Sequence, residues 1–212
     1  MDIDPYEFIN IITAIVAVIK FGYKLNNIAL LIYFVIIFEV FFSYFYAKHY
    51  GNNVIPYNIF ANGCIVFYFH YYFKVLPDRK NKKLFLYLFM AWLVFWMYNI
   101  SNYSNASIDS LTYIFGMFLI LFLIFKYLQN IVYNSAPINY LIKSPHFYFT
   151  VGVVSYFTSC FPLLFLSNTL ILDAQVEDIY QSILLIGNIF LSLGYLGAII
   201  CTPKEAPSTT SS

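Results

Sequence analysis

The chain has 212 residues, of which 61% are hydrophobic, 22% aromatic and only 10% charged. A soluble domain carries about 25% charged residues, so this composition leaves too little polar surface to face water. The net charge of +1 at pH 7 excludes an electrostatic nucleic-acid binder. The apolar residues fall in long blocks, several of which exceed the ~18 residues that suggest a membrane span. Together these features predict an all-α, multi-pass membrane protein.

Seven apolar blocks follow one another along the chain, separated by short polar links. We predict a single transmembrane domain over residues 1–201, followed by a disordered cytoplasmic tail at 202–212 that is rich in Pro, Ser and Thr. Pro5, Pro56 and Pro145 lie where proline is favoured in the first turn of a helix. The seven transmembrane helices are predicted at about residues 6–24, 28–46, 54–75, 83–101, 108–131, 145–172 and 177–201.

The basic residues predict how these helices are oriented. If the N-terminus lies outside, Lys48 is the one basic residue on the outer side. The cytoplasmic side then holds Lys20, Lys24, Lys74, Arg79, Lys80, Lys82, Lys83, Lys126, Lys143 and Lys204. This bias follows the positive-inside rule and predicts an N-terminus outside and a C-terminus in the cytoplasm. Abundant Ile, Phe, Tyr and Asn with a single arginine is typical of an AT-rich genome, and we place the protein in a bacterial inner membrane.

Tyrosines gather near the ends of the predicted spans. Such tyrosines usually anchor a helix in the headgroup region, with the ring toward the lipid and the hydroxyl toward water. An aromatic cage around a ligand is the alternative. The tyrosines concerned are Tyr6, Tyr23, Tyr44, Tyr46, Tyr57, Tyr71, Tyr72, Tyr98, Tyr113, Tyr127 and Tyr133.

Glu39 places a carboxylate inside the second span. A charged residue at a helix centre costs about 2.5–3.5 kcal/mol on insertion scales, so its side chain is expected to face the bundle interior. It lies about seven residues, or ~10 Å, below the outer end of its span. Asn58 and Asn62 lie four residues apart, share one face of the third span and reach a similar depth.

The seventh span carries a second polar stripe, because Gln181, Asn188 and Ser192 fall close to one line along a helix. Asn10 contributes from the first span, and Pro162 is expected to kink the sixth. Two interpretations stay open. The first is a polar ligand-binding pocket in the outer half of the bundle, formed by Glu39, Asn58, Asn62, Gln181, Asn188 and Ser192. The second is interhelical packing in which a protonated Glu39 bonds to Asn62.

Other parts of the chain contain fewer candidate functional residues. The predicted spans at 83–101 and 108–131 are almost uniformly apolar and are expected to face lipid. Cys64, Cys160 and Cys201 have no metal-binding spacing. Serine-hydrolase, metalloprotease and phosphate-loop motifs do not occur. The sequence therefore predicts a protein that is not an enzyme and that has no cofactor and no metal.

A resemblance adds to this interpretation. Glu39, the segment NNVIPYNIF at 52–60 and the segment KSPHFYFTVGVVSYFTS at 143–159 resemble those of small uncharacterised seven-helix membrane proteins of AT-rich bacterial genomes. They also resemble membrane sensor modules that front histidine kinases. The resemblance implies a sensor or accessory protein in the lipid bilayer that acts through a separate membrane or cytosolic signalling partner. A small transporter or channel that uses the same polar residues is the alternative.

Overall fold

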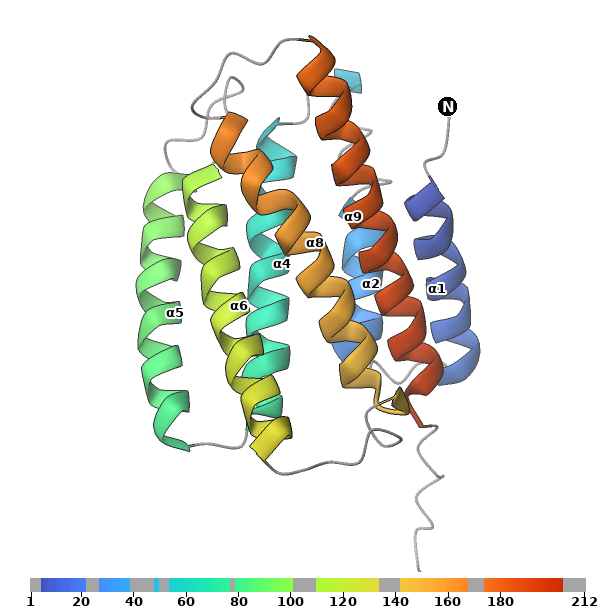
Figure 1. Cartoon of the computed structure of the whole chain (residues 1–212), viewed down its shortest axis with the longest axis vertical. Helices are drawn as coiled ribbons and strands as arrows, with labels where there is room; N and C mark the ends of the chain where they lie inside the picture. Colours follow the sequence, from blue (N-terminus) through green and yellow to red (C-terminus); the bar gives the residue numbers. More distant parts are fainter. Residues whose placement is uncertain are drawn as a thin grey trace, which may run out of the picture.

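A computed structural model describes residues 5–21, 27–38, 48–49, 54–76, 79–100, 110–133, 142–167 and 174–203. These ranges hold seven helices of ten residues or more and no strand, which confirms the all-α prediction. The helices are α1 (Pro5–Phe21), α2 (Asn27–Ile36), α4 (Val54–Val75), α5 (Arg79–Ile100), α6 (Ser110–Tyr133), α8 (Pro145–Ser167) and α9 (Ala174–Cys201). Each helix falls within or closely matches one of the seven predicted segments (Figure 1).

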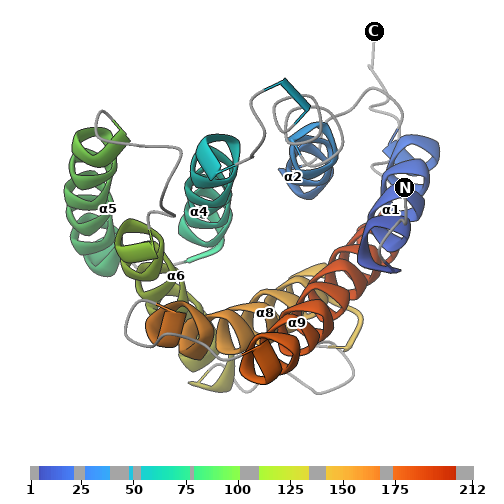
Figure 2. The ribbon, with the colours of Figure 1, turned by 90° about the horizontal axis from the view of Figure 1, so that it is seen from above.

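The helices alternate in direction, so α1, α4, α6 and α9 all end at the same end of the bundle (Figure 1). We call this the lower end and the opposite one the upper end. Six helices form a ring in which α1 contacts α2, α2 contacts α4, α4 contacts α6, α6 contacts α8, α8 contacts α9, and α9 returns to α1. α5 packs outside the ring against α4 and α6, as the view along the bundle shows (Figure 2).

Glycines allow α8 and α9 to approach closely. A Cβ added at Gly194 would lie 2.7 Å from the Cα of Gly152 and 2.8 Å from the carbonyl oxygen of Tyr148. Small residues at a helix interface bring the two backbones together, and this is a common way for helices to associate in membranes. α8 and α9 accordingly share the most extensive helix contact among the described residues.

The side chain of Lys20 joins α1 to the last turn of α9. Its Nζ donates to the carbonyl oxygens of Ile199 and Ile200 at 2.9 and 2.6 Å. The last carbonyls of a helix have no partner within the helix and carry its negative partial charge, so a lysine is favoured there. This contact connects the first and last helices of the ring.

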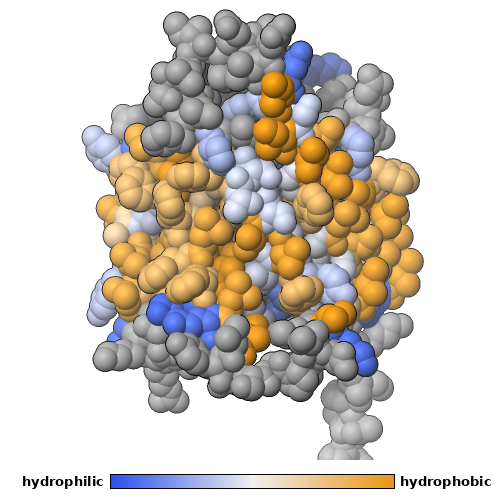
Figure 3. Space-filling model, in the orientation of Figure 1, coloured by the Kyte–Doolittle hydropathy of each residue, from blue (hydrophilic) through white to orange (hydrophobic). Residues whose placement is uncertain are grey.

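Among the described residues, three helices are long enough and apolar enough to cross a membrane. They correspond to Lys82–Ile100 in α5, Leu111–Ile131 in α6 and Asp178–Cys201 in α9. Apolar side chains also form a broad band across the middle of the face in Figure 3, with hydrophilic residues nearer its ends. The coarse prediction of a membrane protein built from helices therefore agrees with the structure.

α5 and α6 differ in the way they are buried. Only 17% of the apolar window of α5 is buried inside the protein, against 50% for α6. α5 is thus largely exposed, and the prediction that its span faces lipid stays a prediction. α6 is more buried because it belongs to the ring and packs against α4 and α8 as well as α5, so at most part of its surface can face lipid.

α8 carries Pro162 in its interior, and the helix continues to Ser167 without ending at the proline. Proline cannot donate the backbone bond to the residue four positions earlier. Near this position, the hydroxyl of Thr158 donates to the carbonyl oxygens of Val154 and Ser155 at 2.8 and 3.0 Å. The expected kink at Pro162 stays a prediction.

Candidate functional site

The ring of six helices encloses a polar cavity of about 40 Å³. Every ring helix contributes at least one side chain to its wall, whereas α5 contributes none of the described lining residues. The lining residues are Tyr6, Asn10, Val35, Tyr57, Phe60, Ala61, Cys64, Tyr68, Tyr113, Tyr156, Asn188, Leu191, Ser192 and Tyr195. Because a water molecule needs about 10–15 Å³ by this measure, the cavity has room for about three.

α4 forms the longest part of the wall. Tyr57, Ala61, Cys64 and Tyr68 follow one another at intervals of four, three and four residues. This spacing keeps all four on one face of a helix. A single face of α4 therefore extends along the cavity and brings two tyrosine hydroxyls to it at different depths.

Two pairs of tyrosines connect helices across the cavity wall. The hydroxyls of Tyr68 on α4 and Tyr195 on α9 are 2.5 Å apart. The hydroxyl of Tyr113 on α6 donates to that of Tyr156 on α8 at 3.5 Å. A hydroxyl can both donate and accept, so these pairs can also bond to a molecule in the cavity.

The clearest open hydrogen-bonding position belongs to Asn10 on α1. The residue is only 4% exposed, lines the cavity, and its Oδ1 has no hydrogen-bond partner among the described residues. A buried acceptor left without a partner costs about 1–3 kcal/mol. A water or ligand with an N–H or O–H group would remove that cost.

The structure brings together part of the predicted site. Asn188 and Ser192 on α9 both line the cavity, and Ser192 is fully enclosed. Gln181, on the same helix, is exposed and is not among the lining residues. It lies seven residues nearer the upper end than Asn188, and the enclosed space does not extend that far.

Asn58 and Asn62 are buried on α4 but do not line the cavity. The Nδ2 of Asn62 donates to the backbone oxygen of Asn58 at 2.9 Å, so this amide bonds to its own helix. Glu39 lies outside the described residues. The predicted contact between Glu39 and Asn62 therefore stays a prediction.

Phe149 packs against tyrosines of the cavity wall and against a tyrosine nearer the lower end. It is 1% exposed, and its ring centroid lies 5.8–6.0 Å from those of Tyr195, Tyr68 and Tyr72. The hydroxyl of Tyr72 donates to that of Thr150 at 3.1 Å. One apolar ring thus contacts both cavity-lining tyrosines and a second group of hydroxyls.

The second group of hydroxyls extends to the start of α8. The hydroxyl of Tyr71 is 2.5 Å from Nδ1 of His146, and the ring of Tyr127 packs edge-on against the same imidazole at 6.3 Å between centroids. The prediction that Tyr71, Tyr72, Tyr113 and Tyr127 anchor the helices in headgroups is wrong, because all four are buried inside the protein.

Sequence reasoning missed the tyrosines that form most of the polar wall. Tyr68, Tyr156 and Tyr195 lie at least six residues from either end of their helices, where an interfacial anchor is out of place. Their depth was the signal that could have identified them, since a mid-span hydroxyl needs a partner within the protein. The alternative of an aromatic cage was closer to the arrangement seen here.

The chemistry of this cavity is neutral. Among the described residues that line it, none is acidic or basic. In the same described part of the chain, no three His, Cys, Asp or Glu side chains come together as metal ligands. Hydroxyls and amides in an apolar surrounding can hold a small uncharged molecule by hydrogen bonds.

Fold and cavity define a helical protein with membrane-length helices and an enclosed, uncharged polar site between them. No family model, curated protein or solved structure matches the chain.

Proposed function

We propose that this chain is a seven-span bacterial inner-membrane protein that senses a small, uncharged hydrogen-bond donor in the cavity between its six ring helices. Binding would be passed to a separate partner, and no bond of the ligand would be broken. The observation that carries the proposal is the buried Oδ1 of Asn10, which lines the cavity and has no partner among the described residues.

The distribution of lysines supports the orientation of the proposed protein. Lys20, Lys74, Lys82 and Lys126 all belong to the lower halves of their helices, toward the lower end of the bundle. Lys48 precedes α4 and belongs to the upper end. Under the positive-inside rule the lower end faces the cytoplasm and the cavity lies in the outer half of the membrane.

The size and lining of the cavity support the class of ligand. A volume of about 40 Å³ suits a molecule of only a few non-hydrogen atoms, far below the ~300–1,000 Å³ of sites for drug-sized ligands. Asn10 supplies an acceptor and the tyrosine hydroxyls supply both donors and acceptors. The absence of charge in the described lining favours a neutral molecule over an ion, because an ion would enter a low-dielectric site without a counter-charge.

A small transporter is the second candidate, and the arrangement around Phe149 favours it. That ring contacts Tyr68 and Tyr195 of the cavity wall and also Tyr71 and Tyr72 nearer the lower end. Movement of one aromatic side chain would join the two polar groups into a path toward the lower end. A sensor needs no such movement, so the two candidates differ in whether the ligand crosses the membrane.

The test compares acetamide with acetone, which have the same number of non-hydrogen atoms but differ in the presence of an N–H donor. We expect acetamide to raise the melting temperature of the detergent-solubilised protein, and acetone to have no effect. The variant Asn10→Leu removes the acceptor and should abolish the response to acetamide. Val18→Leu, on an exposed position of the same helix, is the matched control and should respond like the wild type.

Flux separates the two candidates. Vesicles that contain the protein are exposed to an inward concentration gradient of acetamide, and their swelling is followed by light scattering. Swelling no faster than that of empty vesicles, together with acetamide binding, supports the sensor. Swelling that is accelerated in the wild type and not in Asn10→Leu would assign the protein to transport instead. Equal responses to acetamide and acetone would contradict a polar site altogether.

A further inference from the structure

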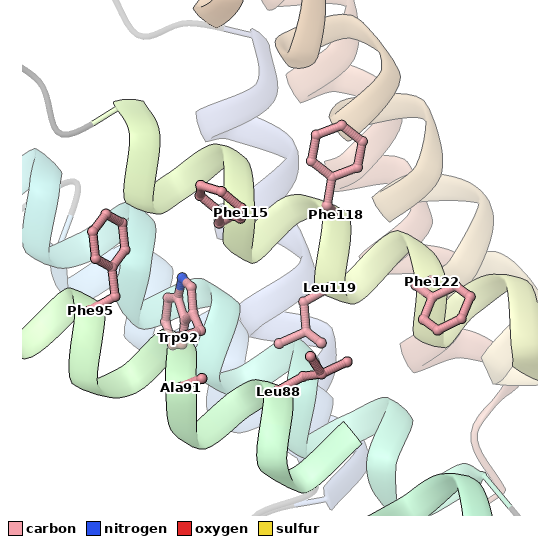
Figure 4. Close-up of a pocket in the computed structure, with 8 residues that line it drawn as sticks. All are labelled: Leu88, Ala91, Trp92, Phe95, Phe115, Phe118, Leu119 and Phe122. Atoms are coloured by element: carbon pink, nitrogen blue, oxygen red, sulfur yellow. The ribbon is translucent and has the colours of Figure 1, made fainter. Parts of the chain in front are cut away.

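A second hollow lies on the outside of the molecule, between α5 and α6. It is an apolar groove of about 500 Å³, more than ten times the volume of the polar cavity. Leu88, Ala91, Trp92 and Phe95 on α5 face Phe115, Phe118, Leu119 and Phe122 on α6 (Figure 4). On each helix the four residues are spaced by three, one and three positions, so each set forms one face of its helix.

A small residue opens the groove and a fixed indole forms its floor. Ala91 lies between the larger side chains of Leu88 and Phe95 on the same helix face (Figure 4). The Nε1 of Trp92 donates to the backbone oxygen of Thr112 at 2.9 Å, and its ring stacks between Phe89 and Trp96 at 5.5 Å from each. The groove is therefore preformed, with a floor that cannot collapse into it.

The groove opens away from the ring. Phe115, Phe118 and Phe122 on one wall and Leu88 on the other are exposed. Both helices are long and apolar enough to cross a membrane, so in the proposed seven-span protein this opening faces lipid. An apolar hollow with no occupant would lose dispersion contacts along its whole wall. A hydrocarbon chain supplies those contacts and needs no hydrogen bond.

Lysines stand at the lower end of the groove. The rings of Phe85 on α5 and Phe122 on α6 meet there at 5.3 Å between centroids. Lys82 precedes Phe85 by three residues and Lys126 follows Phe122 by four. Because the two helices run in opposite directions (Figure 1), both lysines lie about one turn below the aromatic pair, at the level where the apolar slot ends.

These cations have no acidic residue in either helix. α5 and α6 contain neither Asp nor Glu, and Lys83, beside Lys82, is exposed. The Nζ of Lys126 donates to Oε1 of Gln129 at 3.2 Å, and that of Lys82 lies 5.4 Å from the ring centroid of Phe73. Both are neutral partners, and the acidic residues of the described ranges lie at the upper end, so none of them compensates the positive charge at this end of the groove.

We propose that the groove is a binding site for an anionic phospholipid of the cytoplasmic leaflet. One acyl chain lies along the slot between α5 and α6, and the phosphate group contacts Lys82, Lys83 and Lys126. The inference rests on the membrane location in the proposed function but not on the polar cavity or its ligand. Basic pockets between membrane helices on the cytoplasmic side are suited to anionic headgroups.

Charge favours a lipid over a second copy of the chain. Two copies in one membrane share the same orientation, so a symmetric dimer through this groove would bring two sets of Lys82, Lys83 and Lys126 to the same depth beside each other. Like charges close together repel. An anionic headgroup instead neutralises them while its acyl chain fills the apolar wall.

The experiment titrates the purified full-length protein with phosphatidylglycerol or phosphatidylcholine that have identical acyl chains, and counts bound lipids by native mass spectrometry. We expect the wild type to bind phosphatidylglycerol about 100-fold more tightly, because each of the three lysines contributes about fivefold. In the double variant Lys82→Gln/Lys126→Gln this preference should fall by about 25-fold, since each lysine near an anionic lipid contributes about fivefold. Lys74→Gln, at the lower end of α4, is the matched control and should retain the preference.

A substitution that fills the groove tests separately whether an acyl chain binds there. Ala91→Phe places a ring in the groove and should reduce binding of both lipids without changing the preference for charge. Met97→Phe adds a similar ring nine residues from Leu88, on the opposite side of α5, and should bind both lipids like the wild type. Ala91→Leu is a smaller change that tests the same space if the phenylalanine variant unfolds.

Three results would overturn the proposal. They are equal binding of the two lipids by the wild type, an unchanged preference after loss of both lysines, and unchanged lipid binding in a folded Ala91→Phe or Ala91→Leu variant. A wild-type dimer that dissociates in Ala91→Phe would show that a second copy fills the groove. The melting-temperature response to acetamide is measured in the same variants, and it should persist even if lipid binding fails.

Discussion

The polar cavity and the apolar groove are both hollows between long helices, but they differ in how completely helices surround them. Six helices surround the cavity, so its hydroxyls and amides can be satisfied only by one another or by an enclosed molecule. Two helices form the groove, and it stays open to its surroundings. Hydrogen-bonding residues therefore line the enclosed cavity, whereas aliphatic and aromatic residues line the open groove.

The contrast indicates where stability and function lie in this molecule. Residues of the ring contact neighbours on several helices, so their substitution should affect folding and ligand binding together. Except for Trp92 and Leu119, the residues that line the groove are exposed, and substitution of the exposed ones should affect lipid contact with a smaller effect on stability. Matched substitutions in the two regions can test this difference.

The largest difference is expected for phenylalanine. Phe149→Ala removes a buried ring that packs against tyrosines of α4 and α9, and we expect a loss of about 3–5 kcal/mol in the free energy of unfolding. Phe115→Ala, on the groove wall and 58% exposed, should cost less than about 1 kcal/mol. Unfolding of both variants in mixed detergent gives the comparison. Equal losses of unfolding free energy in the two variants would mean that the ring of six helices does not contribute more to stability than the groove.

Glycine substitutions should give an intermediate effect. In Gly194→Ala the new methyl meets backbone atoms of α8 at 2.7 and 2.8 Å, and backbone cannot move aside cheaply. In Gly116→Ala it meets side-chain atoms, namely Ile65 Cγ2 at 2.9 Å and Trp92 Nε1 at 3.1 Å, and side chains can shift at a lower cost than backbone. We expect a loss of about 2–3 kcal/mol for the first and about 1 kcal/mol for the second, in line with overpacking. Melting temperatures of the two variants would decide, and a more damaging Gly116→Ala would contradict the close packing of α8 on α9.

The smallest effect is expected for a single hydroxyl. Tyr195→Phe removes the bond to Tyr68 across α4 and α9, and bonds between membrane helices contribute only about 0.6 kcal/mol on average. Tyr98→Phe, on exposed α5, should change nothing measurable. The acetamide response should weaken in Tyr195→Phe alone. If it stays at the wild-type level, the hydroxyl of Tyr195 does not take part in binding.

Part of the site could be predicted from sequence and part could not. Asn188 and Ser192 were identified because polar residues four apart on an apolar helix point the same way. Gln181 fits that line equally well, but the depth at which six helices close a cavity is not encoded in one helix. Asn62 is buried but does not line the cavity, and its amide bonds to the backbone of Asn58, so its predicted contact with Glu39 stays a prediction.

The roles of the tyrosines were harder to predict. Tyrosines are frequent near the ends of the predicted spans, which suggested that Tyr71, Tyr72, Tyr113 and Tyr127 anchor the helices in headgroups. All four are buried in the structure. A tyrosine has an apolar ring and a polar tip, so it suits a membrane interface and a polar interior equally well. Only the neighbouring helices decide between the two, because they determine whether the hydroxyl meets water or another side chain.

The sequence by itself determined the all-α class and where the described helices lie along the chain, because these depend on the order of apolar residues and on local capping and proline positions. It also predicted that basic residues gather at one end, where Lys20, Lys74, Lys82 and Lys126 lie. Tertiary structure alone decided that α5 lies outside a ring of six helices, that Phe149 packs against tyrosines of α4 and α9, and that Ala91 lies in a groove beside Trp92. Each of these depends on contacts between helices that are far apart in sequence, and helix periodicity carries no information about which helices become neighbours.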